Sequence, residues 1–298
     1  MKKETNNTTI LITGAKGMLG QEVVSRLSTL PATDYQLFPT DKDTLDITDR
    51  RAVQQYFQKT KPNFVVHCAA YVEVDKAEQE KALCKKINVD GTENVAMAAQ
   101  KIKATTIYIS TDYVFDGKIN RPYKETDKTN PLGVYAKTKL EGEKQVAKYC
   151  KKHYILRVAW LFGKAKGKQN FVDKMIELAT KGPVKVINDQ VGSPTSTYDL
   201  AKAISTLIVR HQKAETRPTY GIYHFSGNGE TTRYGFAKEI FRQKKIKANL
   251  TPVKTGEFFA EAKRPAYSYL DKTKIERALQ LKVQTWQKML QDYIKERP

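Results

Sequence analysis

Cysteine and histidine are scarce in this 298-residue sequence, which limits both metal and disulfide chemistry. The three cysteines, Cys68, Cys84 and Cys150, are odd in number and include no Cys-x-x-Cys pair. They exclude a disulfide framework and fit a reducing compartment. The four histidines lie far apart, without the spacing of metal ligands. We therefore predict a cytoplasmic protein that holds no metal.

Long hydrophobic stretches are also missing. No apolar run approaches the roughly 20 residues of a membrane-spanning helix. Residues 1–9 are polar and lack the apolar core of a secretion signal. We therefore expect no membrane partner.

Acidic residues are few relative to basic ones. The chain has 52 Lys and Arg against 32 Asp and Glu, so its formal net charge is +20. The excess is scattered along the chain, and no zinc-finger, leucine-zipper or RNA-binding signature accompanies it. We interpret it as a lysine-rich solvated surface, expect no nucleic-acid partner, and note that the positive field favours phosphate-bearing ligands.

A glycine-rich turn is the first motif present. Residues 8–13 predict a strand, and a helical pattern follows the turn. Gly14 permits a tight turn, Gly17 lets backbone N–H groups approach a pyrophosphate, and Gly20 lets the helix pack on the strand. The start of the helix adds a favourable dipole for phosphates. This combination predicts a dinucleotide site.

The next two strands end in further candidates for that site. Asp41 follows the strand predicted over 35–39; it can accept a hydrogen bond from a ribose hydroxyl or serve as a turn residue. Lys42 can meet a 2′-phosphate, so both NADPH and NADH remain open. Ala69 and Ala70 end a buried strand, where they either leave room for a flat ligand or pack in the core.

Three chemically active side chains follow. The run 105–109 predicts a buried strand with Ser110 and Thr111 at its carboxyl end, the edge where open α/β sheets bind ligands. Tyr135 and Lys139 are four apart, so they share one face of a predicted helix. A free phenol has a pKa of about 10, and a nearby ammonium should lower it. Together the three groups predict a carbonyl-reducing site.

The pattern changes after residue 163. We predict an α/β fold in which residues 1–163 form a Rossmann-type, doubly wound parallel sheet that binds the dinucleotide. Residues 164–298 are expected to form mainly a smaller α/β substrate lobe, with about 196–225 returning to pack on the Rossmann domain. Trp160, at a strand end, can hold a sugar ring or pack in the core. Arg264 can clamp a phosphate or face solvent.

These motifs together resemble the extended short-chain dehydrogenase/reductase family and, within it, the dTDP-4-dehydrorhamnose reductases. The matching stretches include 14–20, 45–49, 74–78, 110–117, 130–135, 187–190, 192–195 and 264–265. The resemblance implies a Rossmann fold and NADPH- or NADH-dependent reduction of the 4-keto group of dTDP-4-dehydro-L-rhamnose to dTDP-L-rhamnose. This step serves dTDP-rhamnose and cell-surface polysaccharide biosynthesis. We expect a nucleotide-sugar substrate and a monomer or homodimer.

The same resemblance implies a role for each residue of the site. Tyr135 would donate the proton, Lys139 would hold the nicotinamide ribose and tune Tyr135, and Thr111 would orient the carbonyl. The implied cofactor contacts are Gly14, Lys16, Gly17, Met18, Gly20, Asp41, Asp46, Ile47, Ala69, Ala70, Tyr71, Tyr135 and Lys139. The implied substrate contacts are Thr111, Asp112 and Trp160, to which our own interpretation adds Arg264.

Two alternatives remain open. Ala159 and Tyr269 depart from the family pattern, so the substrate can be another nucleotide 4-keto-deoxysugar. The regulatory subunit of methionine adenosyltransferase also resembles this family and uses the fold for binding without catalysis. The joint presence of Thr111, Tyr135 and Lys139 favours an enzyme.

Overall fold

A six-stranded parallel sheet forms the centre of the molecule in the computed structural model, which describes residues 7–30, 34–164, 167, 169–257 and 260–295. The strand order is β10-β5-β4-β3-β1-β2, and every neighbouring pair is parallel. The strands are β1 (Thr8–Thr13), β2 (Tyr35–Thr40), β3 (Phe64–His67), β4 (Thr105–Thr111), β5 (His153–Val158) and β10 (Gly221–Phe225). The predicted Rossmann-type, doubly wound fold is confirmed.

The central strands are buried on both faces, as their continuous apolar runs predict. In β1, Ile10 and Ile12 belong to one hydrophobic core and Leu11 to another, and all three are fully buried. Successive side chains of a strand point to opposite faces. The sheet therefore separates two cores.

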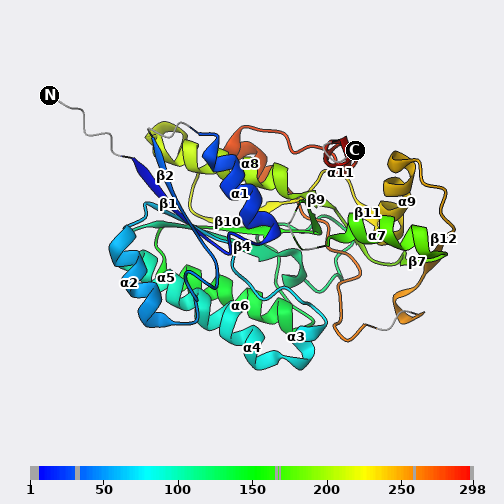
Figure 1. The fold of residues 1–298 in the computed structure, drawn as a ribbon, viewed down its shortest axis with the longest axis horizontal. Helices are drawn as coiled ribbons and strands as arrows, with labels where there is room; N and C mark the ends of the chain where they lie inside the picture. The colour runs from blue at the N-terminus through cyan, green and yellow to red at the C-terminus, as the bar shows by residue number, and fades with distance from the viewer. Residues whose placement is uncertain (1–6, 31–33, 165–166, 168, 258–259, 296–298) are drawn as a thin grey trace.

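Helices cover both faces of the sheet (Figure 1). Helices α1 (Met18–Ser28) and α8 (Thr197–Gln212) pack together over one face. Helices α2 (Arg50–Thr60), α5 (Thr92–Lys101) and α6 (Val134–Tyr149) cover the other. Because α8 and β10 come from the second half of the chain, the sheet domain is not a continuous piece of sequence.

One predicted helix is interrupted. The sequence between 78 and 102 is typical of a single helix, but the structure has α3 (Lys76–Gln79), α4 (Lys81–Lys85) and a π-helix, η1 (Lys86–Gly91), before α5. Within the π-helix, Asn88 donates to the Tyr71 carbonyl at 3.1 Å and to Thr138 Oγ1 at 3.1 Å. The widened turn thus ties this segment to α6, on which Tyr135 and Lys139 lie.

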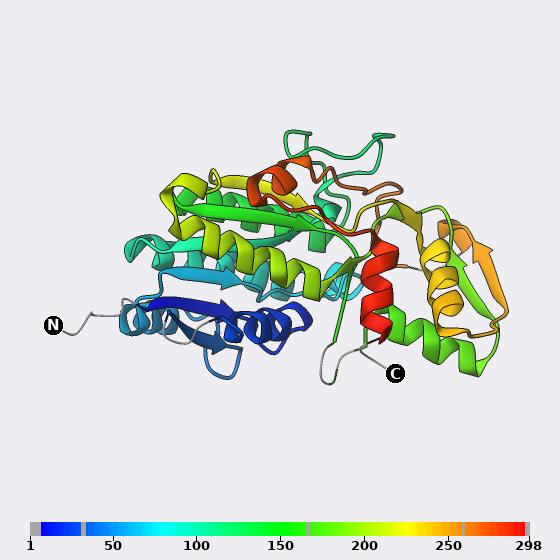
Figure 2. The ribbon, with the colours of Figure 1, turned by 90° about the horizontal axis from the view of Figure 1, so that it is seen from above.

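A smaller lobe lies beyond the carboxyl ends of the sheet strands (Figure 2). It pairs β7 (Val184–Ile187) with β12 (Leu250–Val253) and packs α7 (Phe171–Lys181) against α9 (Arg233–Lys244). The remaining elements are β6 (Leu161–Phe162), β8 (Val191–Gly192), β9 (Thr195–Ser196), β11 (Thr231–Thr232), α10 (Thr273–Leu279), α11 (Trp286–Lys295), η2 (Asp112–Val114), η3 (Ala214–Thr216) and η4 (Thr255–Glu257). In the described parts of the chain, no helix has the length and apolar character to cross a membrane.

Candidate active site

A cavity of about 680 Å³ lies where β1, β3 and β4 end. Its wall brings together most of the residues that the sequence predicts for the site. The predicted cofactor contacts that line it are Gly14, Gly17, Met18, Gly20, Asp41, Asp46, Ile47, Ala69, Ala70, Tyr135 and Lys139. The predicted substrate contacts that line it are Thr111, Asp112 and Trp160. One continuous space therefore joins the glycine turn to the three chemically active groups.

The glycine turn has the geometry of a phosphate cradle. Gly14 has a φ of +68°, a conformation that favours glycine, and an added Cβ would lie 2.7 Å from the Ala69 backbone. A Cβ at Gly20 would lie 2.1 Å from the Gly14 carbonyl oxygen. Gly17 caps α1 without a side chain, so no side-chain acceptor competes at the helix start. These residues fit the diphosphate of a dinucleotide.

The end of β2 supplies a carboxylate and an ammonium. Asp41 accepts hydrogen bonds from the backbone N–H groups of Lys16, at 2.9 Å, and Lys42, at 2.8 Å. Both Asp41 and the exposed Lys42 line the cavity, so a ribose hydroxyl and a 2′-phosphate each have a potential partner here. The Lys16 side chain instead pairs with the exposed Asp43 and is not part of the wall.

Thr111 and Tyr135 meet at the end of β4. Thr111 is the last residue of that strand, and its side chain lies close enough to Tyr135 on α6 to lower the pKa of the phenol in part. The neighbouring Ser110 hydroxyl donates to the buried carboxylate of Glu143 at 2.5 Å. The hydroxyl that accompanies the phenol is therefore that of Thr111.

Burial dominates the protonation of the phenol and the ammonium. It raises the pKa of Tyr135, and the nearby Thr111 hydroxyl offsets only part of the rise. Burial also lowers the pKa of Lys139 to about 7, and its Nζ lies 4.1 Å from the centre of the Tyr108 ring. The lowered phenol pKa that we expected from the ammonium is wrong, because burial of the phenol raises its pKa instead. Tyr135 is therefore protonated at neutral pH.

Asp112 is a buried carboxyl in the same wall. Only 2% of it is exposed, and burial raises its pKa to about 6. Oδ1 accepts a hydrogen bond from Thr111 at 3.1 Å. Oδ2 makes no hydrogen bond of good geometry within the described residues, although Ser268 lies close enough to lower the pKa in part. Such an oxygen is free to accept from a bound ligand.

A buried ion pair holds α6 against the sheet. Arg157 on β5 donates to both carboxylate oxygens of Glu143, at 2.9 and 2.7 Å. Both side chains are almost fully buried, 3% and 4% exposed. This pair and the Ser110 hydroxyl fix the helix that presents Tyr135 to the strand that presents Thr111.

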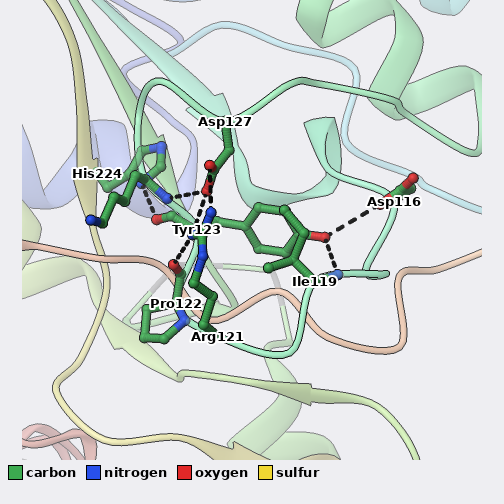
Figure 3. Close-up of polar contacts among 8 residues, drawn as sticks. Asp116, Ile119, Arg121, Pro122, Tyr123, Asp127 and His224 are labelled. Carbon is green, nitrogen blue, oxygen red and sulfur yellow. Dashed lines mark hydrogen bonds and ion pairs between the residues drawn. The ribbon is translucent and has the colours of Figure 1, made fainter.

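The connection from Thr111 to Tyr135 is anchored as well (Figure 3). The Tyr123 carbonyl oxygen contacts His224 Nδ1 on β10 at 3.0 Å, and the Tyr123 hydroxyl donates to Asp116 at 3.3 Å. Arg121 donates twice to Asp127, at 2.8 Å each. The segment that connects Thr111 to Tyr135 is therefore an ordered loop held by its own hydrogen bonds and by β10.

Three predicted contacts lie outside the wall of the cavity: Lys16, Tyr71 and Arg264. The Tyr71 hydroxyl donates to Glu80 at 2.6 Å. Arg264 forms an ion pair with Asp75 at 2.6 Å. Their binding roles stay predictions.

The sequence interpretation missed Arg233, which lines the cavity. It is the first residue of α9, and its guanidinium lies 3.6 Å from the centre of the Trp160 ring. A cation is unfavourable at the positive end of a helix dipole. A cation at the start of a predicted helix is therefore the one signal in the sequence that indicates a binding role for Arg233.

Comparison with known proteins places these observations in context. The family model described as the RmlD substrate binding domain matches residues 8–297. The spore coat polysaccharide biosynthesis protein SpsK of Bacillus subtilis is 36% identical over 291 residues, which cover 97% of this chain and 98% of that protein. The dTDP-4-dehydrorhamnose reductase of Streptomyces griseus is 40% identical over 267 residues, covering 89% and 86%.

Solved structures of dTDP-4-dehydrorhamnose reductases are also similar to this chain. A dTDP-4-dehydrorhamnose reductase from Clostridium acetobutylicum superposes with a TM-score of 0.89 at 42% identity, covering 97% of this chain and 99% of that one. The dTDP-4-dehydrorhamnose reductase of Bacillus anthracis, in complex with NADP, gives a TM-score of 0.89 at 38% identity, again covering 97% and 99%.

Proposed function

The chain belongs to the RmlD substrate binding domain family, and from this premise we propose that it reduces the 4-keto group of dTDP-4-dehydro-L-rhamnose to give dTDP-L-rhamnose. We propose NADPH or NADH as the reductant and dTDP-rhamnose and polysaccharide biosynthesis as the role. The observation that carries the proposal is that Thr111, Tyr135 and Lys139 line the same cavity as the glycine turn. The relatives named as dTDP-4-dehydrorhamnose reductases support the choice of substrate.

The residues around the cavity fit a nicotinamide dinucleotide, which when bound supplies the hydride for C4. Gly14, Gly17 and Gly20 would hold its diphosphate, and Asp41 would hold a ribose. Lys42 would meet the 2′-phosphate of NADPH, the phosphorylated cofactor type that the Bacillus anthracis relative binds.

Tyr135 supplies the proton in this scheme. Thr111 donates a hydrogen bond to the substrate O4 and so orients the carbonyl. As negative charge develops on O4, the Tyr135 phenol gives its proton to that oxygen and becomes phenolate. Lys139, in its protonated form, stabilises the phenolate, which later regains a proton from solvent. The raised pKa of Tyr135 keeps the phenol protonated until the substrate oxygen needs the proton.

Further proposals concern the protein as a whole. We propose that residues 1–163 form the dinucleotide-binding domain and that 164–298 mainly bind the substrate, with about 196–225 packed on the first domain. The pairing of β10 with β5 supports that return. Cytoplasmic location and a monomeric or homodimeric state also remain proposals.

Tyr135→Phe tests the assignment of the proton donor. We expect kcat to fall about 10²- to 10⁴-fold, because a general acid contributes about that much, while the Kd for NADPH stays unchanged. Tyr149→Phe, the same change at the far end of α6, is the control and should keep wild-type kcat. Near-native turnover by Tyr135→Phe would show that another group donates the proton.

A substrate panel with the wild-type protein separates the proposed substrate from its alternatives. Oxidation of NADPH with dTDP-4-dehydro-L-rhamnose supports the proposal. Turnover of a different nucleotide 4-keto-deoxysugar in its place would establish the alternative substrate. Cofactor binding without turnover of any member would favour the regulatory-subunit alternative.

A further inference from the structure

We propose that Arg233 binds a phosphate of the nucleotide-sugar substrate and so sets the affinity for the diphosphate of its nucleotide. This inference rests on the proposed function. It assigns a residue of the smaller lobe, at the start of α9, to the substrate side of the cavity.

The position of the guanidinium is fixed by its neighbours. Its Cζ lies 3.6 Å from the centre of the Trp160 ring, and Nη2 donates to the Tyr113 hydroxyl at 3.3 Å. The Trp160 ring packs directly on Gly192, where an added Cβ would lie only 2.6 Å from the ring. This contact helps to fix the ring. Arg233 is therefore presented to the cavity in a set orientation, at little entropic cost on binding.

The charge of Arg233 is not neutralised by a close ion pair, although it lies near enough to the buried Asp112 to lower the pKa of that carboxyl in part. Among the described residues, no carboxylate lies within ion-pair distance of it, whereas Arg264 is neutralised by Asp75 at 2.6 Å. The start of α9 adds the positive end of a helix dipole at the same place. A half-buried cation that lines a cavity beside another positive potential favours an anionic ligand.

The anion is assigned to the substrate because of where Arg233 lies. The glycine turn that fits the cofactor diphosphate belongs to the sheet domain, whereas Arg233 comes from the other lobe and contacts Trp160. Its planar fork of donors matches a phosphate bidentately, which a lysine does not. A diphosphate of a nucleotide sugar is thus the group that this charge recognises.

The experiment measures binding of dTDP and of uncharged thymidine by calorimetry, with NADPH present at saturation. For Arg233→Met we expect the Kd for dTDP to rise roughly 10- to 100-fold, as for a lost charged hydrogen bond. The Kd for thymidine should change less than about threefold, because thymidine has no phosphate. The KM for the nucleotide sugar should rise by a similar factor to the Kd for dTDP, while kcat changes little. Arg233→Lys should recover part of the affinity.

The controls separate the possible causes of a negative result. Arg242→Met removes an arginine of the same helix that is paired with Glu239 outside the cavity, and it should leave every constant unchanged. Should Arg233→Met fail to fold, Arg233→Gln gives the same readout. Unchanged dTDP affinity, or equal losses for dTDP and thymidine, would overturn the assignment. Failure of the wild-type protein to reduce the 4-keto sugar would instead overturn the proposed function, whatever dTDP binding shows.

Discussion

Replacing Asp112 by asparagine should stabilise the protein at neutral pH relative to its effect at acid pH, although it alters the candidate site. The folded protein holds this carboxyl almost entirely buried, and one of its oxygens has no well-formed hydrogen bond within the described residues. Burial penalises the charged form, so its pKa rises from 3.8 to about 6. The ionised Asp112 is therefore a cost to folding.

The magnitude and its pH range follow from the two pKa values. Between pH 3.8 and about 6 the folded chain binds more protons at Asp112 than the unfolded chain, so stability falls as pH rises. A shift of about two units corresponds to about 3 kcal/mol, fully expressed above pH 6 and absent below about pH 4. The uncharged amide of the Asp112→Asn variant carries no such penalty. Its buried N–H₂ group costs about 1 to 3 kcal/mol if it finds no acceptor, but that cost does not vary with pH.

Urea denaturation at pH 7.5 and pH 4.0 isolates the effect. We expect the stability of Asp112→Asn relative to wild type to be about 3 kcal/mol more favourable at pH 7.5 than at pH 4.0. Asp90→Asn, at an exposed position outside the cavity, should show little difference between the two pH values. If the stability of Asp112→Asn relative to wild type is the same at both pH values, ionising the buried carboxyl does not destabilise the fold and the reasoning fails.

Two further predictions concern charges around the site. Arg157→Met should lower the free energy of unfolding by about 3 to 5 kcal/mol in urea denaturation, because it leaves Glu143 buried without its partner. Adding Glu143→Leu should recover most of that loss. A double variant no more stable than Arg157→Met would contradict this. Lys42→Ala should raise the KM for NADPH about two- to fivefold, as expected for an exposed ion pair, and leave the KM for NADH unchanged. Equal changes in steady-state kinetics with both cofactors would show that Lys42 does not meet a 2′-phosphate.

Much of the fold could be predicted because it depends on local pattern. The buried strand expected over 105–109 extends over Thr105–Thr111, and the helix of Tyr135 and Lys139 runs from Val134 to Tyr149. The glycine turn follows β1 and starts α1, as its spacing predicts. These features require only periodicity and backbone geometry within a few residues.

The rest depends on burial and on partners that are distant in sequence. The direction of the pKa shift at Tyr135 could not be predicted, because the spacing of Lys139 says nothing about desolvation. Arg264 matches a phosphate clamp by type, yet Asp75, 189 residues away, neutralises it. Arg233 reaches the cavity only because the smaller lobe folds over the end of the sheet.

The strand order of the sheet has a consequence for how the protein is made. The edge of β5 receives its partner only when β10 has left the ribosome, since the two are joined through the smaller lobe. At about 5 to 20 residues per second, synthesis from Val158 to Phe225 takes roughly 3 to 13 s. During that interval β5 presents an unpaired row of backbone N–H and C=O groups, the kind of edge that invites pairing between nascent chains. A fragment that stops at residue 163 would keep that edge permanently, so we expect it to aggregate rather than to bind a dinucleotide.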